Sequence, residues 1–238
     1  MGNDYQQSAA RYARRPQDVG TDSLVFRLLD ARFRQLGLDG ESLDVGCGAG
    51  RSTRFLQSLG LRTVGLDISE AMLEEARRAD PEGRYVSYPA GAEFPFLDNR
   101  FGVVLSTWAV LEVATLNALR HLVSESSRVL HPDGAMFVAT NTPEFYAHRW
   151  VSCEIDFPEN RRPLRSGQVV TAMLLPERVQ VRDRFWSDLD YRQVFREAGL
   201  LIRQVSYPTA PDDESGWLEE TEVAPHIIYE LVKGQASS

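Results

Sequence analysis

The sequence predicts an α/β fold, a doubly wound, seven-stranded, mostly parallel sheet with a segment inserted after the fifth strand. Two observations carry this prediction. From about residue 41 to residue 140, short apolar runs alternate with amphipathic helical patterns, which is typical of parallel sheets joined by right-handed crossovers. The alternation stops at residue 141 and resumes near residue 187. We therefore expect one domain over residues 1–238 with an insertion.

The first 37 residues are expected to be helical. Tyr5 and Tyr12 lie seven positions apart, a spacing that places both on one face of a helix. The stretch "DSLVFRLLDARFRQL" continues with apolar residues at helical spacing, and Gly37 is the signal that ends it.

Seven apolar runs are expected to be strands, with helical stretches in the connections. In the helical stretch after the second run, Ser69 can cap the N-terminus. The runs are "SLDV", "RTVGLDI", "RYVSYP", "FGVVLSTWAV", "AMFVAT", "LIRQVSY" and "HIIYELVK".

Residues 141–186 break the pattern, with prolines, arginines and aromatic residues but no crossover helix. Because a structureless connection of this length is uncommon, we expect strands within it. "QVVTAMLL" and "RVQVRDRFW" are predicted to form a hairpin around Pro176. This region is expected to act as a cap over the substrate.

The composition is ordinary for a globular protein, with 43% hydrophobic and 25% charged residues, and the net charge is −8. A negative protein does not favour nucleic acid as its partner. The sequence has no apolar run of membrane-spanning length and no secretory signal. Cys47 and Cys153 are too few for a disulfide framework or a metal cluster. We expect a cytoplasmic monomer or homodimer with a small-molecule substrate and no metal, membrane or nucleic-acid partner.

The stretch "LDVGCGAG" places three glycines between the first strand and a helix. Bare backbone allows a tight turn and close approach of a ligand, and a helix N-terminus offers unpaired N–H groups. Asp44 stands two positions before Gly46, and its carboxylate would repel a pyrophosphate but attract an ammonium group.

Residues after the second strand indicate what else the ligand contains. Asp67 ends that strand, where an acidic side chain bonds ribose hydroxyls. Ile68 and Met72 can enclose a purine ring. A ligand with a ribose, a purine and an amino-acid end therefore fits this loop better than a dinucleotide does.

Four stretches resemble the class I S-adenosylmethionine-dependent methyltransferases and cover about residues 5–140, with the C-terminal strands in addition. "LDVGCGAG" matches their first motif, and "GLDISEAMLEEARR" matches the segment after their second strand. "FPFLDNRFGVVLSTWAVLEV" and "SRVLHPDGAMFVAT" are similar to their later motifs. The resemblance implies a Rossmann-like methyltransferase fold, S-adenosylmethionine as cofactor, and methyl transfer to a small-molecule acceptor.

The resemblance also implies roles for individual residues. It assigns the methionine end to Asp44, Gly46 and Gly48, the ribose to Asp67, and the adenine to Ile68 and Met72. At Ala90 the chain departs from the family, which often has an aspartate that meets the adenine amino group; the backbone of Gly91 and Ala92, or the nearby Glu93, would replace that contact. Thr107 would lie beside the sulfonium, and Tyr12, with Tyr5, would belong to a lid or pack as the apolar face of a surface helix.

Catalysis of this reaction depends mainly on positioning, and a general base is needed only for a protonated amine, a hydroxyl or a carbon acid. Trp108 can offer an aromatic face to a cation, or it can be part of the core. Asn141 ends the fifth strand and can orient an acceptor. His148 is the histidine we expect in a base position, although a structural role is an alternative.

Four residues are candidates for the acceptor site. Arg165, with its neighbouring arginines, can clamp a carboxylate or belong to a solvated basic loop. Tyr146, Trp186 and Tyr191 can form the wall of an acceptor pocket or an aromatic core beside the hairpin.

Three alternatives to methyl transfer follow from the same motifs. A cyclase could close an azetidine ring from the aminobutyrate chain of the cofactor and release methylthioadenosine. A non-catalytic domain could bind the cofactor as a sensor or scaffold, although Asp44 and Asp67 argue against it. A nicotinamide-dependent dehydrogenase would show the spacing G-x-G-x-x-G, which this chain lacks.

Overall fold

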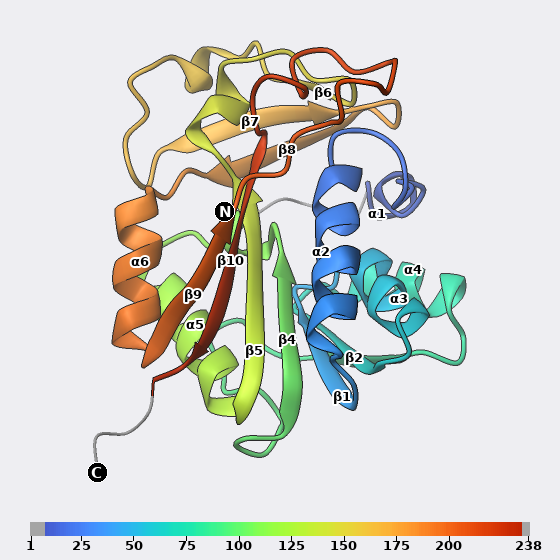
Figure 1. Ribbon diagram of the computed structural model, residues 1–238, viewed down its shortest axis with the longest axis vertical. Helices are drawn as coiled ribbons and strands as arrows, with labels where there is room; N and C mark the ends of the chain where they lie inside the picture. The colour runs from blue at the N-terminus through green and yellow to red at the C-terminus, as the bar shows by residue number, and fades with distance from the viewer. Residues whose placement is uncertain (1–7, 235–238) are drawn as a thin grey trace.

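The computed structural model describes residues 8–234 and contains a seven-stranded sheet between two helical layers (Figure 1). The strand β10 is antiparallel to both of its neighbours, and the remaining pairs are parallel. The predicted mostly parallel sheet is confirmed. In spatial order its strands are β3 (Arg84–Ser87), β2 (Arg62–Asp67), β1 (Glu41–Val45), β4 (Phe101–Thr107), β5 (Leu130–Asn141), β10 (His226–Lys233) and β9 (Leu200–Ser206).

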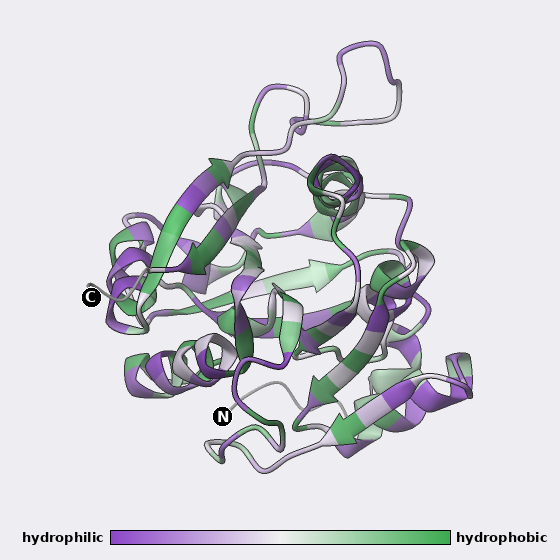
Figure 2. Cartoon of the chain, turned by 60° about the horizontal axis from the view of Figure 1, so that its bottom comes forward, coloured by the Kyte–Doolittle hydropathy of each residue, from purple (hydrophilic) through white to green (hydrophobic). Residues whose placement is uncertain are grey.

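The strand order reverses between β1 and β4, and in doubly wound sheets this point leaves a crevice at the carboxyl ends of the strands. The longer helices pack through apolar stripes, and Figure 2 shows hydrophobic residues along the central strands and a mixed pattern on the helices. No helix formed by residues 8–234 is long and apolar enough to cross a membrane. The helices are α1 (Ala9–Tyr12), α2 (Ser23–Leu36), α3 (Arg51–Ser58), α4 (Glu70–Ala79), α5 (Leu116–Val129) and α6 (Asp188–Glu197).

Each face of the sheet has its own core. On one face, α2 and α3 pack against β4 and β5, for example through Phe33 and Phe137, whose rings lie 4.6 Å apart edge to face. On the other face, α5 and α6 cover the sheet, and Tyr191 and Phe195 of α6 pack on Tyr229 of β10. Both faces are thus fixed independently of the strand ends, where the candidate site lies.

The N-terminal region is less helical than predicted. Only Ala9–Tyr12 form α1, and Tyr5 lies outside the described residues. Pro16 restricts the residue before it to extended conformations, which ends the helical pattern early. The second helix ends as predicted, because Gly37 adopts a left-handed conformation with φ of 60°.

The segment between β5 and α6 forms a second, three-stranded sheet in the order β6-β7-β8, drawn above the ends of β4 and β5 in Figure 1. The predicted hairpin is present as β7 and β8. An apolar cluster of its own, which includes Phe145 and Phe185, holds this sheet together. The elements are η2 (Pro143–Tyr146), β6 (Cys153–Glu154), η3 (Pro158–Asn160), β7 (Val169–Leu174) and β8 (Val179–Arg184), with η1 (Ala109–Leu111) after β4.

Candidate active site

A cavity of about 400 Å³ lies at the carboxyl ends of β1, β2 and β4, a volume within the usual range for small-molecule sites. We call it the loop cavity, because the glycine loop forms its floor. It brings together nine of the predicted site residues, which are Tyr12, Gly46, Gly48, Asp67, Ile68, Met72, Gly91, Thr107 and Trp108.

The glycine loop requires glycine for two reasons that the structure separates. Gly46 has φ of +71°, and a Cβ there would lie 2.2 Å from Cβ of Ala109. At Gly48, with φ of +52°, a Cβ would lie 3.0 Å from Cε of Met72 and 3.9 Å from Cε1 of Tyr12. The first glycine therefore lets η1 approach the loop, whereas the second keeps space beneath the cavity wall.

Asp67 is positioned by two backbone N–H groups. Gly48 N donates to Oδ2 and Ser69 N donates to Oδ1, both at 2.8 Å. Burial raises the pKa of Asp67, and the donated hydrogen bonds oppose that rise. Each oxygen keeps acceptor capacity, so the carboxylate can accept from hydroxyl groups in the cavity. Ser69 occupies the N-cap position of α4 as predicted, but its side chain makes no capping hydrogen bond.

Asp44 does not line the loop cavity, so the predicted direct contact with the methionine end is corrected. Its carboxylate is fully buried, and Oδ2 accepts from the hydroxyl groups of Ser52 and Thr53 at 2.7 Å each. Oδ1 has no hydrogen-bond partner within the described part of the chain. Burial raises the pKa of Asp44 to about 6. Asp44 thus ties the start of α3 to β1.

Apolar groups line the other side of the loop cavity. Ile68 is 56% exposed although it is apolar, and Met72 is buried beside it. Gly91 borders the cavity as predicted, but Ala92 does not, because its carbonyl oxygen instead lies 3.0 Å from Nε2 of His121. His121 itself is a lining residue that the sequence analysis did not predict.

A smaller cavity of about 50 Å³ adjoins the loop cavity, and the two share Tyr12, Arg51, Trp108 and Glu112 as lining residues. We call it the cap cavity, because β7 and β8 form one of its walls. Asn141 and His226 form the opposite wall. Trp108 has φ of +60°, a conformation rare for a large side chain and typical of functional sites.

His226 occupies the centre of a polar network at the cap cavity. Its Nδ1 lies 2.9 Å from Oδ1 of Asn141 and 3.5 Å from Nε1 of Trp108, while Nε2 lies 3.8 Å from Oδ1 of Asp22. The side chain of Asn141 also donates from Nδ2 to the hydroxyl of Tyr146 at 3.1 Å. Burial lowers the pKa of His226 to about 4.

Buried ion pairs connect the two cavities. Oδ2 of Asp22 lies 2.9 Å from Nη2 of Arg15 and 3.0 Å from Nη1 of Arg51, and Arg15 also pairs with Glu177 at 3.3 Å. Burial alone would raise the pKa of Asp22, but Arg15 and Arg51 hold it well below its usual range. Arg51 also lies over the ring of Trp108, at 5.2 Å from the centroid. The start of α3 is thereby fixed to the segment before α2.

The predicted acceptor residues do not share one pocket. Tyr146 is buried behind Asn141. Trp186 and Tyr191 border a third cavity of about 510 Å³, and the Tyr191 hydroxyl lies 3.2 Å from Oγ1 of Thr140. Arg165 is exposed and borders neither this third cavity nor the loop cavity or the cap cavity. The aromatic walls therefore belong to different faces of the sheet.

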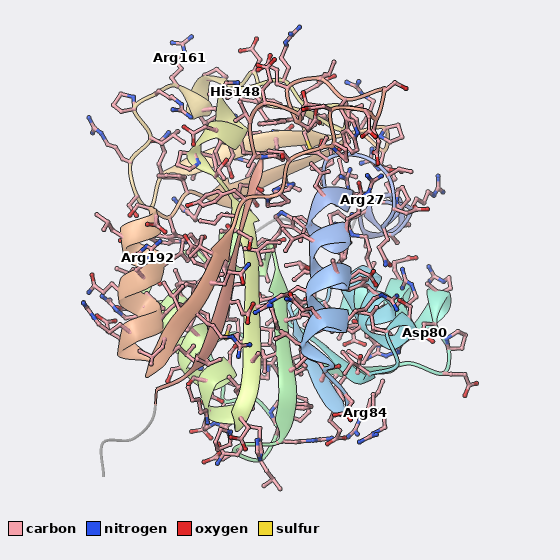
Figure 3. All side chains as sticks on the ribbon, viewed as in Figure 1. Arg27, Asp80, Arg84, His148, Arg161 and Arg192 are labelled. Atoms are coloured by element: carbon pink, nitrogen blue, oxygen red, sulfur yellow. The ribbon has the colours of Figure 1, made fainter. Side chains whose placement is uncertain are left out.

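His148 is not in the predicted position. It lies on the outer part of the small sheet region (Figure 3), with Nδ1 2.6 Å from Oε2 of Glu219. Its side chain is partly exposed and does not border the loop cavity, the cap cavity or the cavity of Trp186 and Tyr191. His226 is the histidine that borders the cap cavity, and the sequence analysis left it without a role.

The residues that could hold the implied cofactor fit its chemistry. The loop cavity offers a carboxylate with free acceptor capacity at Asp67, an apolar wall at Ile68 and Met72, and bare backbone at Gly48. A ribose, a purine ring and an amino-acid chain require these groups.

Comparison with known proteins shows similarity to methyltransferases. Residues 43–138 match the family model described as a methyltransferase domain. The chain is 34% identical over 124 residues to malonyl-(acyl-carrier protein) O-methyltransferase of Enterobacter lignolyticus, covering 52% of this chain and 45% of the relative. It is 37% identical over 75 residues to 18S rRNA (guanine-N(7))-methyltransferase of Bos taurus, covering 32% of this chain and 27% of the relative. The matches thus span less than half of either relative.

The fold is shared over nearly the whole chain. The CcbJ methyltransferase of Streptomyces caelestis superposes with a TM-score of 0.68, covers 96% of this chain and 97% of its own, and is 18% identical. That identity is low enough that the likeness concerns the fold alone. The domain match agrees with the glycine loop and with Asp67, whose geometry suits S-adenosylmethionine. Residues 43–138 are therefore similar to the methyltransferase domain family, and the fold is similar to that of solved S-adenosylmethionine-dependent methyltransferases.

Proposed function

We propose that this protein transfers a methyl group from S-adenosylmethionine to a small-molecule acceptor that enters the cap cavity. The observation that carries the proposal is the position of this cavity, which adjoins the loop cavity at Trp108 and lies beneath β7 and β8. A methyl donor in one cavity and an acceptor in the other would meet at that residue.

Several residues would hold the cofactor in the loop cavity. Asp67 would accept from the ribose hydroxyls, Ile68, Met72 and Gly91 would contact the adenine, and Gly48 would lie beneath the ligand. Tyr12 and Thr107 border the same space. When bound, S-adenosylmethionine supplies an electrophilic methyl group on a positively charged sulfur, and Trp108 borders both cavities where that group would lie.

A small acceptor suits the cap cavity better than a nucleic acid does. The cavity is only about 50 Å³ in size and is closed on one side by apolar residues of the small sheet, including Ala172, Leu174 and Val181. The chain has a net charge of −8, which would repel a phosphate backbone. We therefore do not extend to this protein the acyl-carrier protein and the rRNA that appear in the names of the two relatives.

Mass spectrometry of purified protein with S-adenosylmethionine tests the proposal. The protein is incubated first alone and then with the twenty amino acids, tyramine, catechol and phenol. We expect S-adenosylhomocysteine only when an acceptor is present. Methylthioadenosine formed without any acceptor would contradict methyl transfer and favour the azetidine-forming cyclase, whereas cofactor binding without either product would favour a binding domain.

A further inference from the structure

His226 is the first residue of β10, and its position follows from the direction of that strand. Because β10 runs antiparallel to β5, its first residue pairs with Asn141, the last residue of β5. His226 is therefore at the carboxyl edge of the sheet, where it is 1% exposed and borders the cap cavity.

The hydrogen bonds of Asn141 favour a proton on Nδ1 of His226. Nδ2 of Asn141 donates to Tyr146, so Oδ1 faces His226 and requires a donor, which is Nδ1–H at 2.9 Å. The competing contact from Trp108 to Nδ1 is longer, at 3.5 Å, and is at the limit of a hydrogen bond. Nε2 then carries the lone pair, and it has no hydrogen-bond partner within residues 8–234.

The charges around His226 suit a ring that is neutral at rest and cationic after accepting a proton. Its pKa is lowered to about 4, mainly by burial; Arg51 and Arg15 act in the same direction, and Asp22 opposes them. Oδ1 of Asp22 lies 3.8 Å from Nε2 and would stabilise an imidazolium. The cap cavity also contains Glu112 and Asp183.

We propose that His226 is the general base for the acceptor in the cap cavity, with Asn141 as the residue that positions it. This inference rests on the proposed function, and it restricts the acceptor to a hydroxyl or an amine that carries a proton. The acceptor oxygen or nitrogen forms a bond to the methyl carbon, and the carbon–sulfur bond breaks with its electron pair left on sulfur. The acceptor proton moves to Nε2 of His226.

The tautomer can be tested without cofactor. Nitrogen-15 NMR of the imidazole rings at pH 7, with His226 assigned by comparison with His226→Gln, should show a neutral ring with the proton on Nδ1. That state should persist down to about pH 5, one unit above the value of about 4 for this group. A proton on Nε2, or an imidazolium at pH 7, would overturn the proposal.

Activity is then measured with whichever panel acceptor the wild-type protein methylates. His226→Gln should lower kcat by about 100-fold, the scale of general-base catalysis, with affinity for S-adenosylhomocysteine within about twofold. His131→Gln, which removes an exposed histidine at the opposite end of β5, is the matched control and should retain wild-type kcat. A wild-type kcat in His226→Gln would overturn the assignment of His226 as the general base.

A second variant protects the test against misfolding. Asn141→Asp places a negative charge next to Nδ1, so the acidic limb of the pH profile of kcat should move to higher pH by about one unit or more. An unchanged acidic limb would overturn the proposal, because the charge of Asn141→Asp moves this limb only if the protonation of His226 controls kcat. If the wild-type protein methylates no panel member, the proposed function fails, and the role of His226 as general base fails with it. If the wild-type protein methylates an acceptor and His226→Gln does so equally well, only the role of His226 fails.

Discussion

The loop cavity and the cap cavity meet at Trp108 but are built in different ways. Apart from Tyr12, the loop cavity is lined by residues between Gly46 and Leu122, from the end of β1 to α5. The cap cavity draws on the segment before α2, on η1, on the ends of β5 and β10, and on the small sheet. A site built from one continuous stretch is readable in a sequence, whereas one assembled from distant segments is not.

The largest effect is expected at Gly46, because a Cβ there would lie 2.2 Å from Cβ of Ala109. Gly46→Ala should weaken binding of S-adenosylhomocysteine by about 100-fold or more, since the added clash comes on top of about 1 kcal/mol of backbone strain. Isothermal titration calorimetry measures this. Gly60→Ala is the control, because Gly60 also has a positive φ but no heavy atom within 4 Å of its Cβ position. Equal affinities for both variants would contradict the account of the loop.

The next largest effect concerns the ion pairs that join the two cavities. Asp22→Asn would leave Arg15, whose side chain is 5% exposed, and Arg51 without their shared counter-charge. We expect a loss of about 3 kcal/mol in the free energy of unfolding, measured by urea denaturation. Asp30→Asn, which breaks an exposed pair with Arg34 on α2, should leave the denaturation midpoint unchanged. Similar midpoints for the two variants would show that Asp22 does not join the cavities energetically.

Asp44, which lies behind the glycine loop, should make the free energy of unfolding depend on pH. Its native pKa of about 6 lies above the ordinary value near 4, so the folded state retains a proton over this interval. The contribution to stability is complete below about pH 4 and is lost as the pH rises through 6, a change of about 3 kcal/mol. The wild-type protein should lose stability relative to Asp44→Asn between pH 4 and pH 7. If the difference in unfolding free energy between the two proteins does not change with pH, the Asp44 carboxyl is not held in its protonated form by burial.

The smallest effect is expected at His148, which pairs with Glu219 away from the cavities. His148→Gln should change kcat/KM by no more than about twofold, as for other substitutions outside the site. A fall of about tenfold or more would restore the sequence-based assignment of this histidine and remove the reason for preferring His226.

The predicted site residues that line the loop cavity share one property. Gly46, Gly48 and Asp67 depend on a strand, a turn and a helix that follow one another in the chain, so local patterns are enough to place them. His226 was missed because it lies at the edge only if β10 is antiparallel to β5, and the register between distant strands is not visible in a local pattern. His148 was chosen for its nearness in sequence to Asn141, but the chain turns it outward after η2.

Two further differences have physical causes. Asp44 is adjacent to the glycine loop in sequence, yet the alternation of side chains along β1 and the hydroxyls of Ser52 and Thr53 direct it into the core. Trp186 and Tyr191 are aromatic and near the predicted hairpin, but they pack on the α6 face of the sheet. Proximity in sequence did not predict which face a side chain would occupy.

A crystal structure with S-adenosylhomocysteine and the acceptor found in the panel tests the central claim most directly, namely that two adjoining cavities divide the two ligands. The account predicts the ribose hydroxyls at Asp67, the sulfur beside Trp108, and the acceptor in the cap cavity with its reacting atom near Nε2 of His226. An acceptor bound instead between α6 and β10, in the cavity of Trp186 and Tyr191, would contradict it.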